Sequence, residues 1–214
     1  PLAAISGSAQ VLADDLGSAG SSEPQNDELT KIILRESDRL ANTITNFLKF
    51  ARPENIKQDW FLLRPCVEEI LQVCRADQKW PATCSVDVQI DPKFRVWGDE
   101  KQLCGVIGQL LQNALSFCPE GNEKLELSGS IILAADNQEL CLIKISDNGP
   151  GIEPEEVQKI FEPFFTTRTD GTGLGLAIAN QVIEAHHGSI AVEKSEMGGA
   201  CFTLILPQKS EAVD

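Results

Sequence analysis

Apolar residues in the first 51 positions follow a spacing of alternately three and four residues, the pattern of the seam between packed helices. The first set consists of Leu2, Ile5, Ala9, Leu12 and Leu16. A stretch rich in Gly, Ser and Pro interrupts the pattern, which resumes between Asp27 and Ala51 and stops at Arg52–Pro53. The spacing therefore predicts a helical hairpin over residues 1–52.

The second predicted helix has more apolar positions than one partner helix covers. Ile32, Leu34 and Leu48 lie outside its heptad seam. Such a helix favours a dimeric four-helix bundle built from two hairpins. The alternative is a monomeric hairpin that packs on the rest of the chain.

Beyond a polar linker at residues 53–59 the pattern becomes a mixture of strands and helices. Strands are predicted at 60–63, 85–91, 94–98, 127–135, 140–147, 189–194 and 199–207. Helices are predicted at 65–79, 99–118, 154–161 and 173–187, the second beginning with Asp99 as N-cap. These elements predict an α/β sandwich over residues 60–209, with a tail at 210–214, and an α+β class for the whole chain.

Charge and cysteine content exclude some function classes. The net charge of −14 argues against a surface for nucleic acid or anionic membranes. No run of 18 apolar residues occurs, so these residues contain no predicted membrane span. Seven cysteines without a C-x-x-C pair predict buried free thiols in a reducing compartment, against the alternatives of a disulfide framework or a metal site.

The stretch SDNGPG follows a predicted strand directly. It places Asp147 at the strand end, where Gly149 and Gly151 allow a sharp turn. A carboxylate held on a rigid strand end suits an exocyclic amine such as that of adenine. An Asx-type turn is the structural alternative.

Glycines also open the predicted helix at 173–187. Gly171, Gly173 and Gly175 leave free N–H groups and a positive dipole end, which favour phosphate. Neither common phosphate-loop motif is matched, since G-x-x-x-x-G-K-[ST] is absent and a loop precedes these glycines. A tightly packed helix entry is the alternative.

Gln109 and Asn113 are four residues apart and share one helix face. The side-chain oxygen of Asn113 is a suitable magnesium ligand beside phosphates. A polar residue that bonds the backbone within the core is the alternative for Asn113.

Together, Asn113, the SDNGPG stretch, IFEPFFTTR and GTGLGL resemble, in this order, the four nucleotide-binding boxes of sensor histidine kinases. The resemblance covers about residues 60–207 and implies a fold of the histidine kinase, gyrase and Hsp90 type that binds ATP and Mg²⁺. It implies that Asn113 ligates the metal, that Asp147 reads the adenine amine, and that Gly149 and Gly151 shape the pocket floor.

The resemblance also implies a mobile lid at Phe161–Thr172, in which Phe164 and Phe165 pack. Its other implied ATP-binding residues are Phe165, Thr167, Arg168, Thr172, Gly173, Leu174 and Gly175. Arg168 would compensate triphosphate charge, and Gly173, Leu174 and Gly175 would face the phosphates.

Two positions depart from the family pattern. Gln109 stands where Asn is usual, and Ser116 where a basic residue often follows. Gln109 remains a possible phosphate or metal contact through hydrogen bonds or water, whereas Ser116 supplies no charge. A related ATPase that drives conformational change is the alternative function. It would need a carboxylate at 109 to activate water, and an amide cannot take a proton. A dimer that binds ATP without transferring phosphate is a third reading.

The family carries its phosphoacceptor histidine in the pattern H-E-x-R-N-P-L, and Pro1–Leu2 resemble its last two letters. The acceptor is then expected five residues before Pro1, so this fragment would not phosphorylate itself. His186 and His187 are predicted to be structural residues at a helix end capped by Gly188.

The resemblance implies a homodimer through the hairpin and a response regulator receiver domain as partner. It places these residues in the cytoplasm, with any membrane anchor in sequence before Pro1.

Overall fold

The chain divides into two compact units, Pro1–Arg52 and Pro53–Asp214, which are described separately. The computed structural model describes residues 6–7, 9–11, 13–14, 24–51, 56–77, 80–168 and 171–209. No helix in these described ranges is both long and apolar enough to cross a membrane.

The first unit contains the long helix α2 (Pro24–Ala51). It begins earlier than the predicted Asp27, because Pro24 suits the first turn of a helix. The described residues between Ser6 and Asp14 are also helical, whereas the predicted inter-helix loop lies outside the described residues. Several apolar side chains of α2 are 40–56% exposed, namely Ile32, Ile33, Leu40, Ile44, Phe47 and Leu48.

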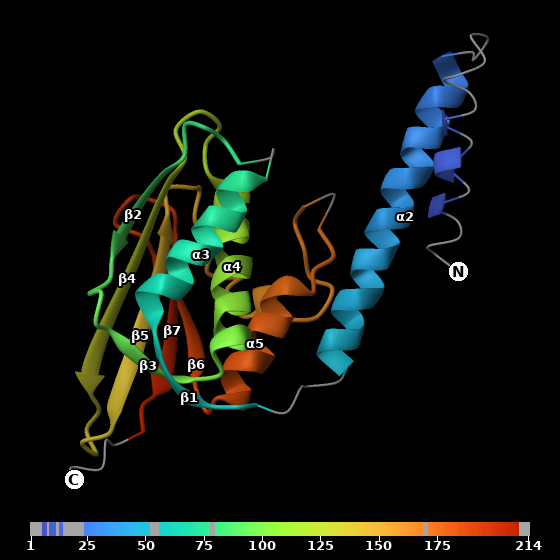
Figure 1. The fold of residues 1–214 in the computed structure, drawn as a ribbon. Helices are drawn as coiled ribbons and strands as arrows, with labels where there is room; N and C mark the ends of the chain where they lie inside the picture. Colours follow the sequence, from blue (N-terminus) through green and yellow to red (C-terminus); the bar gives the residue numbers. More distant parts are fainter. Residues whose placement is uncertain are drawn as a thin grey trace. The chain divides into compact units, whose positions relative to one another are not determined.

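The second unit is built on a five-stranded sheet with the order β2-β4-β5-β7-β6 (Figure 1). The strands are β2 (Ser85–Gln89), β4 (Lys124–Leu133), β5 (Glu139–Asp147), β7 (Ala200–Pro207) and β6 (Ser189–Lys194). Only β2 and β4 pair in parallel, and the other three ladders are antiparallel. Strands β5 and β7, which are far apart in sequence, therefore lie side by side.

Three helices cover one face of this sheet: α3 (Leu63–Ala76), α4 (Glu100–Phe117) and α5 (Gly175–Ala185) (Figure 1). A separate two-stranded ladder joins β1 (Asp59–Leu62) to β3 (Arg95–Gly98). Helices on one face of a mixed sheet confirm the predicted α+β class.

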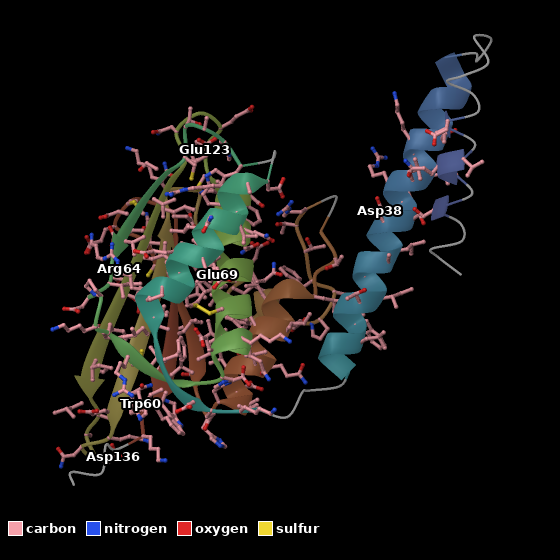
Figure 2. The ribbon with its side chains drawn as sticks, in the orientation of Figure 1. Asp38, Trp60, Arg64, Glu69, Glu123 and Asp136 are labelled. Atoms are coloured by element: carbon pink, nitrogen blue, oxygen red, sulfur yellow. A yellow bond between two sulfur atoms is a disulfide. The ribbon has the colours of Figure 1, made fainter. Side chains whose placement is uncertain are left out.

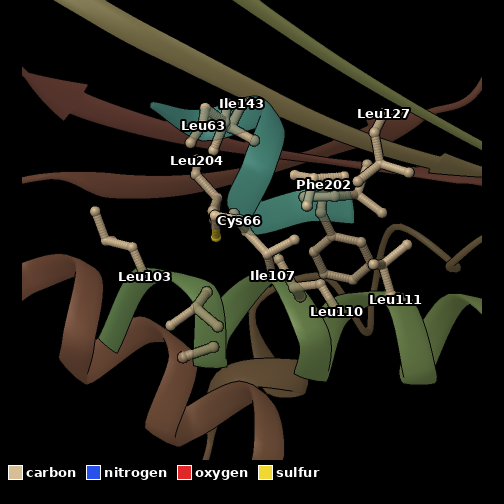
Figure 3. Close-up of a cluster of buried hydrophobic side chains, with 14 of the residues drawn as sticks. Leu63, Cys66, Leu103, Ile107, Leu110, Leu111, Leu127, Ile143, Phe202 and Leu204 are labelled. Atoms are coloured by element: carbon tan, nitrogen blue, oxygen red, sulfur yellow. The ribbon is translucent and has the colours of Figure 1, made fainter. Parts of the chain in front are cut away.

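The core lies between the sheet and the helices (Figure 3). Phe202 and Ile143 point down from the sheet, and Leu110 of α4 points up toward them; each is 2% exposed or less. Alternation along β5, with Cys141, Ile143 and Ile145 buried, explains why this strand was recognisable from sequence.

Helix α4 begins as predicted. The Oδ1 atom of Asp99 accepts a hydrogen bond from the Gln102 N–H at 3.1 Å, which is an N-cap contact. Its Oδ2 atom accepts from the Lys57 N–H at 2.9 Å. The cap therefore fixes the start of α4 and ties it to the end of the linker.

The predicted helix at 154–161 is wrong for most of its length. Turns occupy the segment, followed by the 3₁₀ helix η1 (Lys159–Phe161). Among its residues only Ile160 is fully buried. One buried side chain gives too little apolar face to hold a regular amphipathic helix.

The capping residue predicted for α5 is also wrong. His187, with φ 61°, takes the left-handed conformation just past the helix, and the Gly188 N–H donates to the Ile183 carbonyl at 2.9 Å. Gly188 is small for another reason: a Cβ there would collide with the Ile205 carbonyl oxygen.

The expectation of free thiols is wrong for two of the seven cysteines, because a disulfide joins Cys66 to Cys104. These residues are 38 apart in sequence and meet only because α3 packs beside α4. Cys74, Cys141 and Cys201 are buried free thiols, and Cys84 and Cys118 are half-buried.

Candidate functional site

Asp147 is the last residue of β5, and its side chain is held by the main chain. It is 3% exposed. Its Oδ1 atom accepts hydrogen bonds from the Gly149 N–H at 2.8 Å and the Ala200 N–H at 3.1 Å. No residue in the described ranges donates to Oδ2. One carboxylate oxygen thus fixes the side chain, and the other remains available to a donor from a ligand.

The carboxyl of Asp147 is placed at an electrostatic cost. Burial raises its pKa, and the two backbone N–H groups offset this only in part. A donor that meets Oδ2 would relieve the desolvation of the charged form. The site therefore favours a ligand with an amine-type donor.

Small residues make room for this carboxylate. A Cβ at Gly199 would collide with Asp147 Oδ1 and with the Gly149 nitrogen. A Cβ at Gly149 would lie 2.8 Å from the Phe117 carbonyl oxygen. Gly151, with φ 82°, turns the chain after the strand. Sequence reasoning missed Gly199 and Ala200, although a Gly-Gly pair before a strand was a usable signal.

One face of α4 connects the two ends of the candidate site. Gln109, Asn113 and Phe117 follow at intervals of four residues, which places them along one face over about 12 Å. The Phe117 carbonyl lies against Gly149, as described above. At the other end, a Cβ on Gly175 would lie 2.7 Å from Gln109 Nε2, so this amide contacts the start of α5.

Asn113 lies between these two contacts. Its side chain is half-buried and makes no hydrogen bond to any described residue. The structural alternative, an Asn that bonds the backbone inside the core, is therefore not observed. No group of three or more His, Cys, Asp or Glu side chains in the described ranges could hold a metal, so a magnesium ion here would rely on amide and ligand oxygens.

Helix α5 begins at a residue that cannot cap it. Leu174 occupies the N-cap position fully buried, and its apolar side chain makes no capping hydrogen bond. The hydroxyl of Thr172 accepts only a long bond, 3.4 Å, from the Leu174 N–H. The N–H groups of the first turn and the positive end of the dipole are thus available to an anion.

The predicted lid folds against this helix start. The Phe164 N–H donates to the Gly173 carbonyl at 2.8 Å. Both residues have positive φ, 69° and 67°. A Cβ at Gly173 would collide with the Phe164 backbone. The loop can therefore close here only with glycine at 173.

Only one of the two neighbouring phenylalanines in the lid packs against the core. Phe165 is half-buried against the core, whereas Phe164 is 61% exposed, so the prediction that both pack is wrong. Thr167 is exposed, and Arg168 is half-buried and donates its N–H to Thr166 Oγ1 at 3.1 Å. Ser116, which replaces a basic residue, bonds the Gln112 carbonyl of its own helix instead.

The structure thus gathers the predicted residues into two groups joined by α4. Asp147, Gly149 and Gly151 form one end, which we call the strand end. Gln109, Gly173, Leu174 and Gly175 form the other, the loop end. A separate hollow of about 470 Å³ beside β1 and the start of α4 contains none of them.

Two family models match the chain. Residues 98–210 match the family described as histidine kinase-, DNA gyrase B-, and HSP90-like ATPase. Residues 1–56 match the His Kinase A (phospho-acceptor) domain. The first match covers all of the site residues named above.

Curated relatives are bacterial kinases. Sporulation kinase B of Bacillus subtilis is 31% identical over 209 residues, covering 97% of this chain and 46% of that protein. The histidine-protein kinase AtoS of Escherichia coli is 34% identical over 214 residues, covering 97% of this chain and 32% of that protein. The chain thus spans less than half the length of these relatives.

Solved structures share the fold. The mycobacterial sensor histidine kinase MprB has a TM-score of 0.61 at 26% identity, over 72% of this chain and 99% of that one. The catalytic domain of histidine kinase ThkA has a TM-score of 0.60 at 28% identity, over 71% of this chain and 96% of that one. The histidine kinase AdeS of Acinetobacter baumannii has a TM-score of 0.65 at 21% identity, over 98% of this chain and 96% of that one. At this identity the likeness shows the fold alone.

Proposed function

The chain belongs to the sensor histidine kinases of two-component systems, and on this premise we propose that residues 60–209 bind Mg-ATP for transfer of its γ-phosphate to a histidine. The observation that carries the proposal is the face of α4 described above. It runs from the Asp147 carboxylate to the start of α5, and between them lies the Asn113 amide, which bonds no residue in the described ranges. The order of Asp147, Asn113 and the start of α5 along α4 corresponds to the order of the base, the metal and the phosphates in bound Mg-ATP.

We assign the roles accordingly. Asp147 Oδ2 accepts a hydrogen bond from the adenine amine, while Gly149 and Gly151 form the floor beneath the base. The Asn113 side-chain oxygen holds Mg²⁺, which when bound neutralises part of the triphosphate charge. We assign Gln109 a contact with the same phosphates or the metal, made directly or through water.

The phosphates themselves are assigned to the loop end. We assign the N–H groups around Gly173, Leu174 and Gly175 to the anion, because helix N-termini favour phosphate. The lid residues Phe165, Thr167, Arg168 and Thr172 cover the nucleotide and exclude water. Because phosphoryl transfer depends mostly on positioning and charge stabilisation, these residues need no covalent role.

The acceptor histidine is not one of the two in this chain. His186 is 2% exposed, and both ring nitrogens are engaged: Nδ1 bonds the Val182 carbonyl at 2.8 Å, and Nε2 accepts from the Asp99 N–H at 3.0 Å. His187 belongs to the turn that ends α5. We therefore propose that phosphate is transferred to a histidine outside these 214 residues.

The first unit is proposed to dimerise. The phospho-acceptor family implies dimerisation and two-component relay in general. The exposed apolar side chains of α2 supply the surface that a second hairpin would cover. A response regulator receiver domain is the proposed recipient of the phosphate.

A nucleotide-driven ATPase is less well supported. Water activation needs a base one turn before Asn113, and the Gln109 amide there cannot accept a proton. An ATP-binding dimer without transfer remains the simplest competing function for this chain alone.

Calorimetric titration with ATP, ADP and GTP in the presence of Mg²⁺ tests nucleotide binding. We expect ATP and ADP to bind and GTP, which has no amine at the matching position, to bind at least tenfold more weakly. Labelled ATP then tests transfer: the 214-residue chain should remain unlabelled, and a longer version carrying the inferred histidine should gain acid-labile, base-stable phosphate. Equal GTP binding would remove the adenine assignment, and label on His186 or His187 would remove the acceptor assignment.

A further inference from the structure

One covalent feature of the second unit lies outside the nucleotide site. A disulfide joins Cys66 of α3 to Cys104 of α4, with Cα atoms 6.2 Å apart (Figure 2). Neither cysteine has a role in the assignments above. We propose that this pair is a reversible thiol–disulfide site, which forms and opens with the thiol redox state and staples α3 to the first half of α4.

The two helices run in parallel where the staple lies. Cys66 meets Cys104, and one turn further along both helices a Cβ at Gly108 would lie 3.5 Å from the side chain of Ile70. The helices are thus in contact at two successive turns. The cross-link fixes the turn that precedes the Gln109–Asn113 face.

The two sulfur atoms differ in access. Cys66 is 3% exposed and belongs to the buried core cluster (Figure 3), whereas Cys104 is half-buried. An external thiolate therefore reaches the Cys104 sulfur first. This asymmetry gives the pair an entry point, which a disulfide buried on both sides would lack.

The remaining thiols are poor competitors for exchange. Burial raises the pKa of Cys141 to about 12 and that of Cys84 to about 11, and it also raises the pKa of Cys74. Because the thiolate is the attacking species, these residues rarely rearrange the pair. Burial also raises the pKa of Cys118, and Cys201 is shielded because it is buried. We therefore expect the exchange mainly at Cys66 and Cys104.

The exchange is balanced with a low-molecular-weight dithiol as reductant. Its thiolate attacks Sγ of Cys104, the Cys66–Cys104 bond breaks, and Cys66 leaves as a thiolate that takes a proton. The second thiol of the reductant then displaces Cys104, so that one protein disulfide becomes two thiols and the dithiol becomes a cyclic disulfide. Oxidised glutathione closes the pair in two exchanges: the Cys104 thiolate attacks it and releases one glutathione thiolate, and the Cys66 thiolate then attacks Cys104 Sγ and releases the second.

The test uses the 214-residue chain equilibrated with either reduced or oxidised glutathione. Alkylation in denaturant followed by mass spectrometry should find all seven cysteines modified in the reduced chain and five in the oxidised chain, with Cys66 and Cys104 in one cross-linked peptide. Oxidation should raise Tm by roughly 5–15 °C, as expected for a closed loop of this length. Amide exchange should slow in α3 and the first half of α4.

Cys104→Ala should abolish the redox-dependent change in Tm, whereas the matched control Cys84→Ala should retain it. These readouts do not depend on nucleotide, so they remain valid if the proposed function fails. Seven modified cysteines in the oxidised chain, a cross-link at other positions, or a Tm change that persists in Cys104→Ala would each overturn the proposal.

Discussion

The strand end and the loop end of the candidate site are built in different ways. At the strand end, Asp147 sits on a five-stranded sheet, and backbone N–H groups from two separate segments hold its Oδ1 atom. At the loop end, donors come from a glycine-rich turn, and the lid beside it is held by a backbone bond between Phe164 and Gly173 and by the packing of Phe165. The first end is fixed by the fold, and the second by local loop geometry.

Under the proposed function, this difference predicts how the two ends would share the binding of ATP. A base is planar and constant in shape, so a rigid acceptor on a strand end can read it. A triphosphate loses its terminal group during reaction, so its contacts need elements that move on a faster timescale than a sheet. Changes at the strand end should then affect every adenine nucleotide equally, and changes at the loop end should affect ATP most.

The largest effect is expected from Gly199→Ala. The new methyl group would meet Asp147 Oδ1 and the Gly149 nitrogen, and both are held by the main chain. We expect a loss of about 1–3 kcal/mol in the free energy of unfolding, and loss of binding for ATP and adenosine alike. Chemical denaturation and calorimetry measure both.

Gly105→Ala is the matched control for this change. A Cβ at Gly105, on an open face of α4, meets nothing within 4 Å. Alanine there should stabilise the domain by about 0.5–1 kcal/mol. If Gly199→Ala left the stability as high as Gly105→Ala does, the backbone around Asp147 would not be rigid.

The second-largest effect is expected from Asn113→Ala, which should act through the metal. Loss of the side-chain amide should weaken Mg-ATP binding by about 1–2 kcal/mol, and leave adenosine binding unchanged. Titration of ATP with and without Mg²⁺ checks this. Gln112→Ala, an exposed neighbour on the same helix, should bind normally; equal metal dependence in both variants would contradict the assignment.

Acid should affect the strand end through Asp147. Burial raises its folded-state pKa, so as pH rises from the ordinary Asp range the unfolded chain ionises first. The stabilisation that the protonated Asp147 side chain gives the folded state is therefore fully present at low pH. It is lost as pH rises through the raised folded-state pKa. ATP and adenosine affinity should change in the opposite direction and fall on acidification, in calorimetric titrations across that window, because a protonated carboxyl loses its acceptor charge.

The smallest effect is expected from Gln109→Ala. Gln109 is exposed, and its amide lies next to Gly175. Its loss should weaken ATP binding by about 0.5 kcal/mol and leave adenosine binding unchanged. Comparison of the two ligands by calorimetry checks the result, and an equal loss for both would break the distinction between the ends.

Local signals made part of this molecule predictable from sequence. Asp99 as the N-cap of α4 and the alternating pattern of β5 depend on neighbours within a few residues, and both were confirmed. Side-chain spacing alone also placed Gln109 and Asn113 on one helix face. The fold class followed from such local patterns.

Contacts between distant segments were not predictable in this way. Ala200 donates to Asp147 across 53 residues of sequence, and Cys66 reaches Cys104 across 38. Each pair exists only because the sheet order and helix packing bring it together. His187 took the left-handed position expected of Gly188, since packing against Ile205 requires glycine at 188.

Calorimetry on Asp147→Asn tests the central claim most directly. Oδ1 must still accept from Gly149 and Ala200, so the new amide NH₂ is forced to face the adenine amine, donor against donor. Affinity for ATP and adenosine should fall by about 1–3 kcal/mol, or roughly 5- to 150-fold in Kd. The free energy of unfolding should be unchanged or higher, because a buried charge is removed. Unchanged affinity for both ligands in a folded variant would contradict the account.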